Sequence, residues 1–347
     1  MLVACQPFDS ISEQLTFGNN NLRRVPILRK GAVGFLTNFF AFFQLLIKER
    51  VDFVHAHYVF PAATWGVIGK LLGASITVTS HGLDIQKDKA IGYGMRLNKI
   101  FALITWLTLK LIDVHVVVSK SMVKDAIDSG SNPSKIRVVY NGIDLKKIHS
   151  MKGTNILQQF GLTKEDLILL YLGRLHPKKC PADLIKALPK VAQAVPNAKL
   201  VFAGEGEERD NLEKLVLNLN ISDKVIFTGF VSEDEKWDLL KNCDVFVLPS
   251  IIEGHPISLI EAMACGKPVL TTDSGPFPEI VKNGKTGILV PLHSPDRLAE
   301  EIINLAMDNE KRKAMGRKAR KDVEERFDIN RVADAYSKIF ALTKKRS

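Results

Sequence analysis

The sequence predicts an α/β protein with two Rossmann-like, doubly wound domains. Short strands rich in β-branched residues alternate with helix-length segments along the whole chain. Several of these strands are continuous apolar runs, which is typical of parallel strands that are buried on both faces. The chain has 347 residues, enough for two domains of ordinary size. Alternating strands and helices favour doubly wound sheets, and the number of strands suffices for two.

The expected strands fall into two groups, one in each half of the chain. In the first half we expect strands at 52–56, 76–80, 113–119 and 136–140. In the second half we expect them at 167–173, 199–204, 225–229, 244–249, 268–272 and 287–291. The turn at Asn141-Gly142 marks the boundary, so the predicted domains cover residues 1–150 and 151–347. A last helix over about 330–342 is expected to pack outside the second sheet.

The composition is that of a folded globular protein, with 46% hydrophobic and 25% charged residues. The cysteines are scattered, without a C-x-x-C pair or a His-rich cluster, at Cys5, Cys180, Cys243 and Cys265. This pattern indicates reduced thiols in a cytoplasmic protein and disfavours a zinc site or a disulfide framework. The apolar stretches 33–47 and 100–112 are shorter than the roughly 20 residues that cross a bilayer. We interpret them as core or interfacial helices.

The net charge of +10 is concentrated in the first half of the chain. Residues 1–155 carry 19 Lys and Arg against 10 Asp and Glu, a net charge of +9, whereas the remainder carries +1. One interpretation is that lysines simply coat the helix faces. The other is that the first half meets an anionic surface such as a membrane leaflet. Nucleic acid is disfavoured because no helix-turn-helix, RNA-binding or zinc-finger pattern accompanies the charge.

The strongest functional signal lies between residues 249 and 269, where Glu253 and Glu261 are eight positions apart. A strand is followed by a turn and by a helix expected over 257–265, which ends at Gly266. Amide groups at such a helix start can bind a phosphate. Ionised glutamates on either side can accept hydrogen bonds from sugar or ribose hydroxyls. Phosphate and polyol together describe a nucleotide sugar.

A second cluster of basic residues follows the strand that ends at Gly173. Arg174 is expected at the carboxyl edge of a parallel sheet, where ligands bind in such folds. A guanidinium there and the ammonium of Lys179 can hold both phosphates of a diphosphate. We interpret Lys178 as an exposed surface charge.

The two segments resemble the retaining glycosyltransferases of family 4. The first matches the family wording E-G-x-P-x-x-x-x-E-A-M-A-x-G-x-P-V, and the second matches G-R-L-x-x-x-K-G, with Cys180 in place of its glycine. The resemblance implies a GT-B fold with the active site between the domains. It also implies transfer of a hexose from a nucleoside diphosphate, with retention and front-face attack, in which the leaving phosphate accepts the acceptor's proton.

The resemblance assigns roles to individual residues. Glu253 is expected to orient the donor sugar and Glu261 the ribose, while Arg174 and Lys179 neutralise the diphosphate. Further diphosphate contacts are expected from the amides of Ile257, Ser258 and Leu259. The backbone near Gly204 and Val231 is expected to approach the nucleotide.

Histidines end two strands of the first half. His81, followed by Gly82, resembles the family's His-Gly, whose histidine meets the transferred sugar. We interpret His57 as lining the acceptor side and His55 as packing beneath the sheet. The pair is spaced like metal ligands, but no third ligand is near it in sequence, so no metal is expected there.

Other patterns narrow the choice of function. No G-x-G-x-x-G loop is present, which disfavours a nicotinamide or flavin dehydrogenase. No D-x-D occurs, so we expect the protein's own cations to replace a divalent metal, with no cofactor beyond the donor itself. The basic first half favours a lipid or lipid-linked acceptor and peripheral contact with the inner face of a membrane.

One departure from the family supports an alternative function. The opening βα element, roughly 30 residues in such units, is expected to be missing. This favours a non-catalytic nucleotide-sugar-binding or partner subunit. A nucleotide-sugar epimerase of related fold is disfavoured, because the wording around Glu253 and Glu261 follows family 4.

Overall fold

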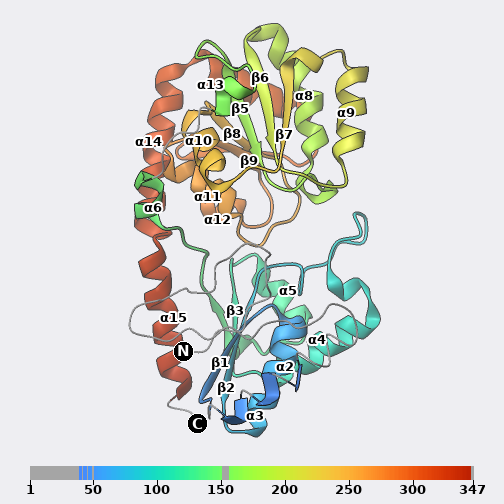
Figure 1. Ribbon diagram of the computed structural model, residues 1–347, viewed down its shortest axis with the longest axis vertical. Helices are drawn as coiled ribbons and strands as arrows, with labels where there is room; N and C mark the ends of the chain where they lie inside the picture. Colours follow the sequence, from blue (N-terminus) through green and yellow to red (C-terminus); the bar gives the residue numbers. More distant parts are fainter. Residues whose placement is uncertain (1–38, 41, 45, 49–50, 151–155, 345–347) are drawn as a thin grey trace.

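The computed structural model of the chain describes residues 39–40, 42–44, 46–48, 51–150 and 156–344. Two α/β domains lie one above the other along the long axis of the molecule, each with helices around a central sheet (Figure 1). All strand pairs in the two named sheets are parallel. The predicted pair of Rossmann-like domains is therefore confirmed. The expectation of a missing opening element and the position of Cys5 lie outside the described residues.

The first sheet has four strands in the order β1-β2-β3-β4. They are β1 (Phe53–His57), β2 (Ser75–Ser80), β3 (Val114–Val117) and β4 (Ile136–Val138). The accompanying helices are α2 (Thr64–Gly66), α3 (Ile68–Leu71), α4 (Lys99–Leu111) and α5 (Met122–Asp128). Ile76 and Val78 of β2 are fully buried, and the core that they form also contains Ile85 and Leu109. The strand predictions for this half are confirmed to within a few residues at each end.

The second sheet has six strands in the order β10-β9-β8-β5-β6-β7. They are β5 (Leu167–Leu172), β6 (Ala198–Ala203), β7 (Val225–Gly229), β8 (Val245–Leu248), β9 (Val269–Thr272) and β10 (Gly287–Val290). Strand β5 pairs with β6 on one side and with β8 on the other. The chain order therefore reverses between β5 and β8. In doubly wound folds such a reversal leaves a crevice at the carboxyl ends of the two strands, where ligands bind.

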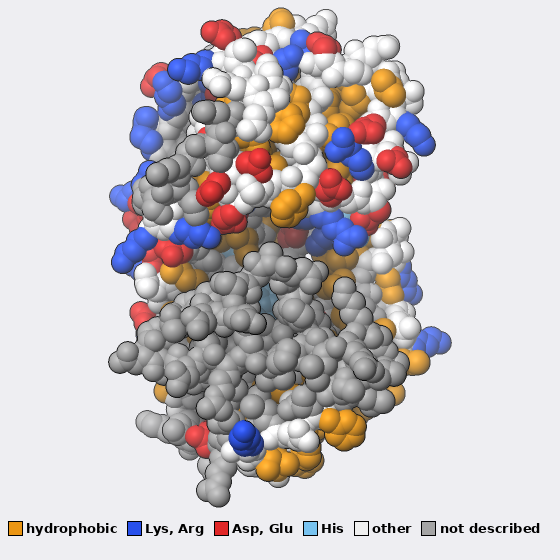
Figure 2. Space-filling view, viewed as in Figure 1, with side chains coloured by type: hydrophobic (Ala, Val, Ile, Leu, Met, Phe, Trp, Pro, Cys, Tyr) orange, Lys and Arg blue, Asp and Glu red, His pale blue; other side chains and the backbone are white. Residues whose placement is uncertain are grey.

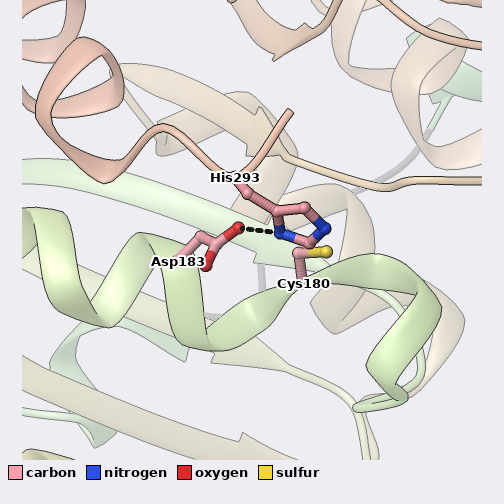
Figure 3. Close-up of side chains that lie close together, drawn as sticks. All are labelled: Cys180, Asp183 and His293. Atoms are coloured by element: carbon pink, nitrogen blue, oxygen red, sulfur yellow. Dashed lines mark hydrogen bonds and ion pairs between the residues drawn. The ribbon is translucent and has the colours of Figure 1, made fainter. Parts of the chain in front are cut away.

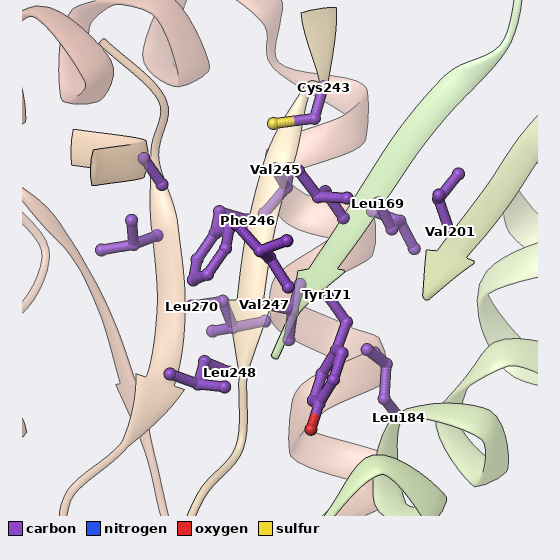
Figure 4. Packing of buried hydrophobic residues seen from close by; sticks show 14 of the residues in the cluster. Leu169, Tyr171, Leu184, Val201, Cys243, Val245, Phe246, Val247, Leu248 and Leu270 are labelled. Atoms are coloured by element: carbon purple, nitrogen blue, oxygen red, sulfur yellow. The ribbon is translucent and has the colours of Figure 1, made fainter. Parts of the chain in front are cut away.

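Helices surround the second sheet, and their packing explains the continuous apolar strands. The helices are α7 (Ile156–Gln159), α8 (Pro181–Ala194), α9 (Arg209–Asn218), α10 (Glu233–Asn242), α11 (Ile257–Ala264), α12 (Phe277–Ile280), α13 (Pro295–Met307) and α14 (Asn309–Arg326). Leu169, Tyr171 and Phe246 are fully buried in the core that the strands share with these helices (Figure 4). Strands covered on both faces need apolar residues at every position, which is the pattern that the sequence shows.

The chain crosses between the domains twice, and the two crossings are joined by hydrogen bonds. The first leads from β4 into α6 (Leu145–Ser150), and the second leads from α14 into α15 (Ile329–Lys344). The amide of Ile143 donates to the carbonyl of Phe327 at 2.9 Å, and the amide of Ile329 donates to the carbonyl of Ile143 at 3.0 Å. A Cβ on Gly142 would lie 2.7 Å from Val332 Cγ2, so only glycine fits where the two crossings meet.

The last helix lies elsewhere than the sequence suggested. Helix α15 runs along the first domain (Figure 1), where Ile339 is buried with Val116 of β3 and Val139. The hydroxyl groups of Tyr336 and Thr79 lie 2.9 Å apart. The expectation that this helix packs outside the second sheet is wrong, because its apolar face covers the first sheet once the chain has crossed back.

The two apolar stretches were interpreted as helices without a membrane span. Residues 100–112 form most of α4, as expected. The stretch 33–47 lies partly outside the described residues, and its described part from residue 39 onward is helical. Within the described ranges, no helix combines the length and apolar character needed to cross a bilayer.

Candidate functional site

The predicted binding residues gather where the second sheet reverses its strand order. The loop after β5 carries Arg174 and Lys179, and the loop after β8 carries Glu253. Because β5 and β8 are parallel neighbours, their carboxyl ends lie side by side. The fold thus joins two segments that are about 75 residues apart in sequence, at the edge where ligands bind in this class of sheet.

Glu253 is buried and surrounded by donors. Its Oε1 accepts a hydrogen bond from Lys179 Nζ at 2.5 Å and another from Ser250 Oγ at 3.1 Å. Its Oε2 lies 3.5 Å from Lys178 Nζ. Burial raises the pKa of the Glu253 carboxyl, but the ammonium groups of Lys179 and Lys178 outweigh burial and hold that pKa below its ordinary value. Glu253 is therefore a fixed carboxylate in a desolvated place.

Lys178 is part of this cluster, so its interpretation as an exposed surface charge is wrong. Its side chain is only 15% exposed, and its Nζ lies 4.5 Å from the centre of the Tyr93 ring. Burial lowers the pKa of Lys178, while Glu253 opposes that shift. Tyr93 comes from the first domain and was not predicted as a site residue. No sequence motif surrounds it, and only the packing of the two domains brings it here.

Arg174 lies apart from Glu253. Its side chain is 69% exposed and pairs with Glu207, at 3.1 Å between the Arg174 Nη2 and Glu207 Oε2 atoms. His176 Nε2 lies 3.4 Å from Oε1 of the same carboxylate. The sequence analysis did not predict Glu207 as a partner, although this residue lies only three positions after Gly204.

The predicted nucleotide contacts at Gly204 and Val231 lie at the ends of β6 and β7. Gly204 has φ 139°, and a Cβ there would lie 2.2 Å from the carbonyl oxygen of Gly173. Its amide donates to the carbonyl of Gly229 at 2.9 Å. Val231 is half-buried against the core of the second domain. The structure thus gives Gly204 a packing reason of its own, because two loops approach each other at this residue.

Helix α11 begins at the candidate site. Its N-cap is Pro256, which supplies no side-chain capping hydrogen bond, so the first amides have no side-chain partner of that kind. These are the predicted phosphate ligands Ile257, Ser258 and Leu259. The Ile257 side chain is exposed and that of Leu259 is buried in the core. The start of the helix is therefore anchored, and its positive end directly follows the loop that carries Glu253.

Glu261 occupies the next turn of α11 and pairs with Lys236 of α10, at 2.7 Å between the Glu261 Oε1 and Lys236 Nζ atoms. Burial raises the pKa of Glu261, and the ammonium of Lys236 partly opposes that shift. Lys236 also lies 3.1 Å from Glu233. The sequence did not single out Lys236, because a lysine in a polar helix carries no signal of its own.

The first domain presents two stacked histidines. His57 Nδ1 and His81 Nε2 lie 2.8 Å apart, and the two rings are nearly parallel. Burial, reinforced by His57, lowers the pKa of His81 to about 4. His81 is therefore neutral at physiological pH. His55 bonds Thr79 at 2.9 Å and contacts the Tyr336 ring of α15, which agrees with a packing role.

The two domains meet at these residues. The carbonyl of Glu253 accepts a hydrogen bond from Gln86 Nε2 at 3.2 Å. The carboxylate of Glu279 accepts hydrogen bonds from the amides of Lys120 and Ser121, at 2.8 and 2.7 Å. A Cβ on Gly254 would lie 2.3 Å from the carbonyl oxygen of His81, so Glu253 and His81 lie in adjoining parts of one interdomain junction. The part-buried ammonium groups of Lys178 and Lys179, the buried carboxylate and the uncapped helix start together suit a ligand with a diphosphate and several hydroxyl groups.

One group of potential metal ligands lies beside the loop that carries Arg174 and Lys179. Within the described part of the chain, the ligand atoms of Cys180, Asp183 and His293 lie within 4.8 Å of one another (Figure 3). The sequence disfavoured a zinc site because no cysteine or histidine cluster is visible. His293 is more than 100 residues from the other two, so only the fold brings this group together.

Comparisons with known proteins agree with this geometry. Residues 153–322 match the family model described as "Glycosyl transferases group 1", and residues 3–147 match "Glycosyltransferase Family 4". The chain is 30% identical over 296 residues to an N-acetyl-alpha-D-glucosaminyl L-malate synthase of Bacillus anthracis, which covers 84% of this chain and 75% of that relative.

Two further comparisons concern a lipid-linked reaction and the fold. The chain is 26% identical over 306 residues to a UDP-Gal:alpha-D-GlcNAc-diphosphoundecaprenol alpha-1,3-galactosyltransferase of Escherichia coli, covering 86% of this chain and 77% of that relative. A crystal structure of HepE from Anabaena in complex with UDP and glucose superposes with a TM-score of 0.78 at 21% identity, covering 92% of this chain and 86% of that one. The last comparison identifies the two-domain fold as that of the GT-B proteins.

Proposed function

Since the chain belongs to the glycosyltransferase family described by these two models, we propose that it transfers a hexose from a nucleoside diphosphate sugar to an acceptor with retention of configuration. In this arrangement residues 1–150 form the acceptor side and residues 151–347 bind the donor. The observation that carries the proposal is the buried Glu253, paired with the part-buried Lys178 and Lys179, next to the uncapped start of α11. The alternative of a non-catalytic subunit is not favoured, because both family models describe glycosyltransferases and the relative from E. coli is a galactosyltransferase.

Binding of the donor would change the ion-pair partners of Lys178, Lys179 and Glu253. In the structure both ammonium groups pair with Glu253. A bound diphosphate would attract the ammonium groups and occupy the amides of Ile257, Ser258 and Leu259. The Glu253 oxygens would then be free to accept hydrogen bonds from the sugar hydroxyls. Glu261, buried and paired with Lys236, would accept from the ribose in the same way.

The chemical step uses charges that the protein itself supplies. The bond between the anomeric carbon and the phosphate oxygen breaks, and the acceptor oxygen bonds that carbon on the same face. The acceptor's proton passes to the leaving phosphate oxygen. Lys179, the α11 amides and Arg174 after release from Glu207 would stabilise the negative charge of the nucleoside diphosphate. These cations do the work that a divalent metal does elsewhere, so we expect no metal in the step.

A lipid or lipid-linked acceptor is favoured by the surface of α4. This helix buries Thr105 and Thr108 and turns large apolar side chains to the solvent, namely Ile100, Leu103, Trp106, Leu107 and Leu111. Lys99 and Lys110 on the same helix are exposed. An exposed apolar face with flanking cations suits an anionic leaflet. The relative from E. coli, whose substrate carries diphosphoundecaprenol, supports the same class of acceptor.

Neighbouring elements extend this apolar surface. Leu71 at the end of α3 is 86% exposed and Leu72 is 46% exposed, and hydrophobic side chains gather at that end of the molecule (Figure 2). Over the second domain, by contrast, acidic and basic side chains are mixed (Figure 2). We therefore place the protein at the inner face of a membrane, in contact with it through the first domain.

The test of the proposed function is a donor assay. The purified chain is incubated with UDP-, GDP- and ADP-hexoses and with a lipid-diphosphate sugar acceptor, and release of the nucleoside diphosphate and the anomeric configuration of the product are measured. The proposal expects one nucleotide class to be turned over, with the donor's configuration kept. Binding of a donor without turnover of any acceptor, or an inverted product, would contradict it.

A further inference from the structure

Three side chains carry ligand atoms suited to a metal ion. They lie next to the loop after β5 that carries Arg174 and Lys179, here called the donor loop. Cys180 precedes α8, Asp183 lies in the first turn of α8, and His293 lies between β10 and α13. The Asp183 Oδ2 and His293 Nδ1 atoms lie 3.1 Å apart, and all three ligand atoms lie within 4.8 Å of one another. In Figure 3 the Cys180 thiol lies close to the imidazole ring of His293, and the dashed line joins that ring to the Asp183 carboxylate.

The backbone at two of these residues is unusual. Cys180 has φ 48° and His293 has φ 51°, both in the left-handed region. Only four non-glycine residues of the described chain have a positive φ, and these are two of them. The conformation costs on the order of 1 kcal/mol at a residue with a side chain, and residues held in it cluster at functional sites. Glycine, which the related wording has at position 180, would adopt it freely.

We propose that Cys180, Asp183 and His293 bind a divalent cation of the zinc type, with a fourth position left for solvent. A thiolate, an imidazole and a carboxylate are the ligands that zinc prefers, whereas Mg²⁺ and Ca²⁺ prefer oxygen alone. Bond lengths of about 2.0–2.3 Å place zinc ligands roughly 3–4 Å apart, so small side-chain rotations suffice. Binding would displace the thiol proton, and the two negative ligands would balance the charge of the ion.

Access and surroundings agree with such a site. Cys180 and Asp183 are buried, whereas 61% of the His293 side chain is exposed. An ion can therefore reach the site from solvent on the side of His293, and its other two ligands are shielded from water. The thiol donates a weak hydrogen bond to the Pro177 carbonyl at 3.6 Å and also interacts with the backbone of Ile251. The bound ion would join the turn that carries Lys179 to the loop before α13. It would thereby restrict the movement of these two segments relative to each other.

The experiment uses Co²⁺ as a spectroscopic substitute for zinc. The purified chain is reduced, freed of metal with a chelator and titrated with Co²⁺. A thiolate-to-cobalt charge-transfer absorption that saturates at one equivalent, and that Zn²⁺ abolishes, is expected. Zn²⁺ should also raise the midpoint of thermal unfolding. No charge-transfer absorption in the unchanged chain would overturn the proposal.

Two variants keep the backbone and remove a ligand. Cys180→Gly suits the left-handed turn and should lose the absorption, and His293→Asn, also tolerant of that conformation, should weaken Co²⁺ binding at least tenfold. Cys265→Ser and Cys5→Ser serve as matched controls and should bind as the unchanged chain does. If Cys180→Gly does not fold, the exposed His293→Asn decides. An unaltered titration in either ligand variant would show that the metal binds elsewhere.

Discussion

Gly254 lies directly against the carbonyl group of His81. A Cβ on Gly254 would lie 2.3 Å from that oxygen, closer than real Cβ atoms come. Gly254 follows the buried carboxylate Glu253, and His81 follows strand β2 of the other domain. The glycine thus lets the two halves of the candidate site approach each other. The same sequence motif places the carboxylate and makes room for the first domain.

The variant Gly254→Ala tests this contact. Gly254 has no positive φ, so alanine suits its backbone, and the added methyl should act only by separating the domains. Overpacking of this kind typically costs about 1–3 kcal/mol, so sugar transfer should fall about tenfold or more. Gly69→Ala, where a Cβ meets only ordinary contacts at 3.4 Å, is the matched control. Equal transfer rates in both variants would show that the contact is not needed.

Replacing Glu253 by glutamine tests the donor site. The amide keeps the size of the side chain but loses the charge that holds Lys178 and Lys179. Sugar transfer should fall at least tenfold, which corresponds to about 1.4 kcal/mol. Glu310→Gln, at a side chain that is 83% exposed, serves as the control. Unchanged turnover of Glu253→Gln, with folding confirmed by circular dichroism, would remove Glu253 from the site.

Removal of metal ions should leave sugar transfer intact. The proposed step relies on Lys179, Arg174 and the α11 amides, and no D-x-D motif is present. Rates measured with EDTA and with added Mg²⁺ or Mn²⁺ should agree closely. A strict requirement for either ion would contradict the proposed mechanism. The zinc-type site at Cys180 is separate from this test, because no catalytic role is assigned to it.

Stability should depend on pH through His81. In the folded chain burial and His57 lower its pKa to about 4, against 6.5 for an ordinary histidine. Between these values the unfolded chain binds more protons, so the contribution of His81 to the free energy of unfolding falls as pH drops below 6.5, by up to about 1.4 kcal/mol per pH unit.

The variant His81→Asn isolates this effect. The free energies of unfolding of the variant and the unchanged chain are measured by denaturant titration from pH 7.5 to about 5, within the window set by the two pKa values. The advantage of the unchanged chain should shrink as pH falls. A difference that stays constant over this range would mean that His81 titrates normally in the folded state.

Docking to a membrane can be tested on α4. The protein should sediment with anionic but not with neutral vesicles, and should be released as salt rises. Burying an exposed leucine is worth about 1.5–3 kcal/mol, so Leu103→Glu should weaken vesicle binding about tenfold or more. Leu217→Glu, at an exposed leucine of the second domain, is the matched control. Absence of binding to anionic vesicles at low salt would indicate an acceptor that is not in a membrane.

The sequence alone determined the class of fold and the strands. Runs such as Leu167–Leu172 are apolar at every position, which only a strand covered on both faces requires. Both ends of α11 were also predictable. Gly254 and Pro256 form the turn before its first residue, and Gly266 follows its last turn. These are local signals, since each depends on residues that are neighbours in the chain.

The tertiary structure decided which distant residues meet. It brought Lys178 and Tyr93 to Glu253, paired Arg174 with Glu207, placed α15 on the first sheet and set His293 beside Cys180. None of these contacts has a local pattern, because a lysine in a loop has the same sequence signature whether it is solvated or buried. Each contact follows from strand order and from the two crossings between the domains. These features arise when apolar faces far apart in the chain are buried together, and the spacing of neighbouring residues does not record them.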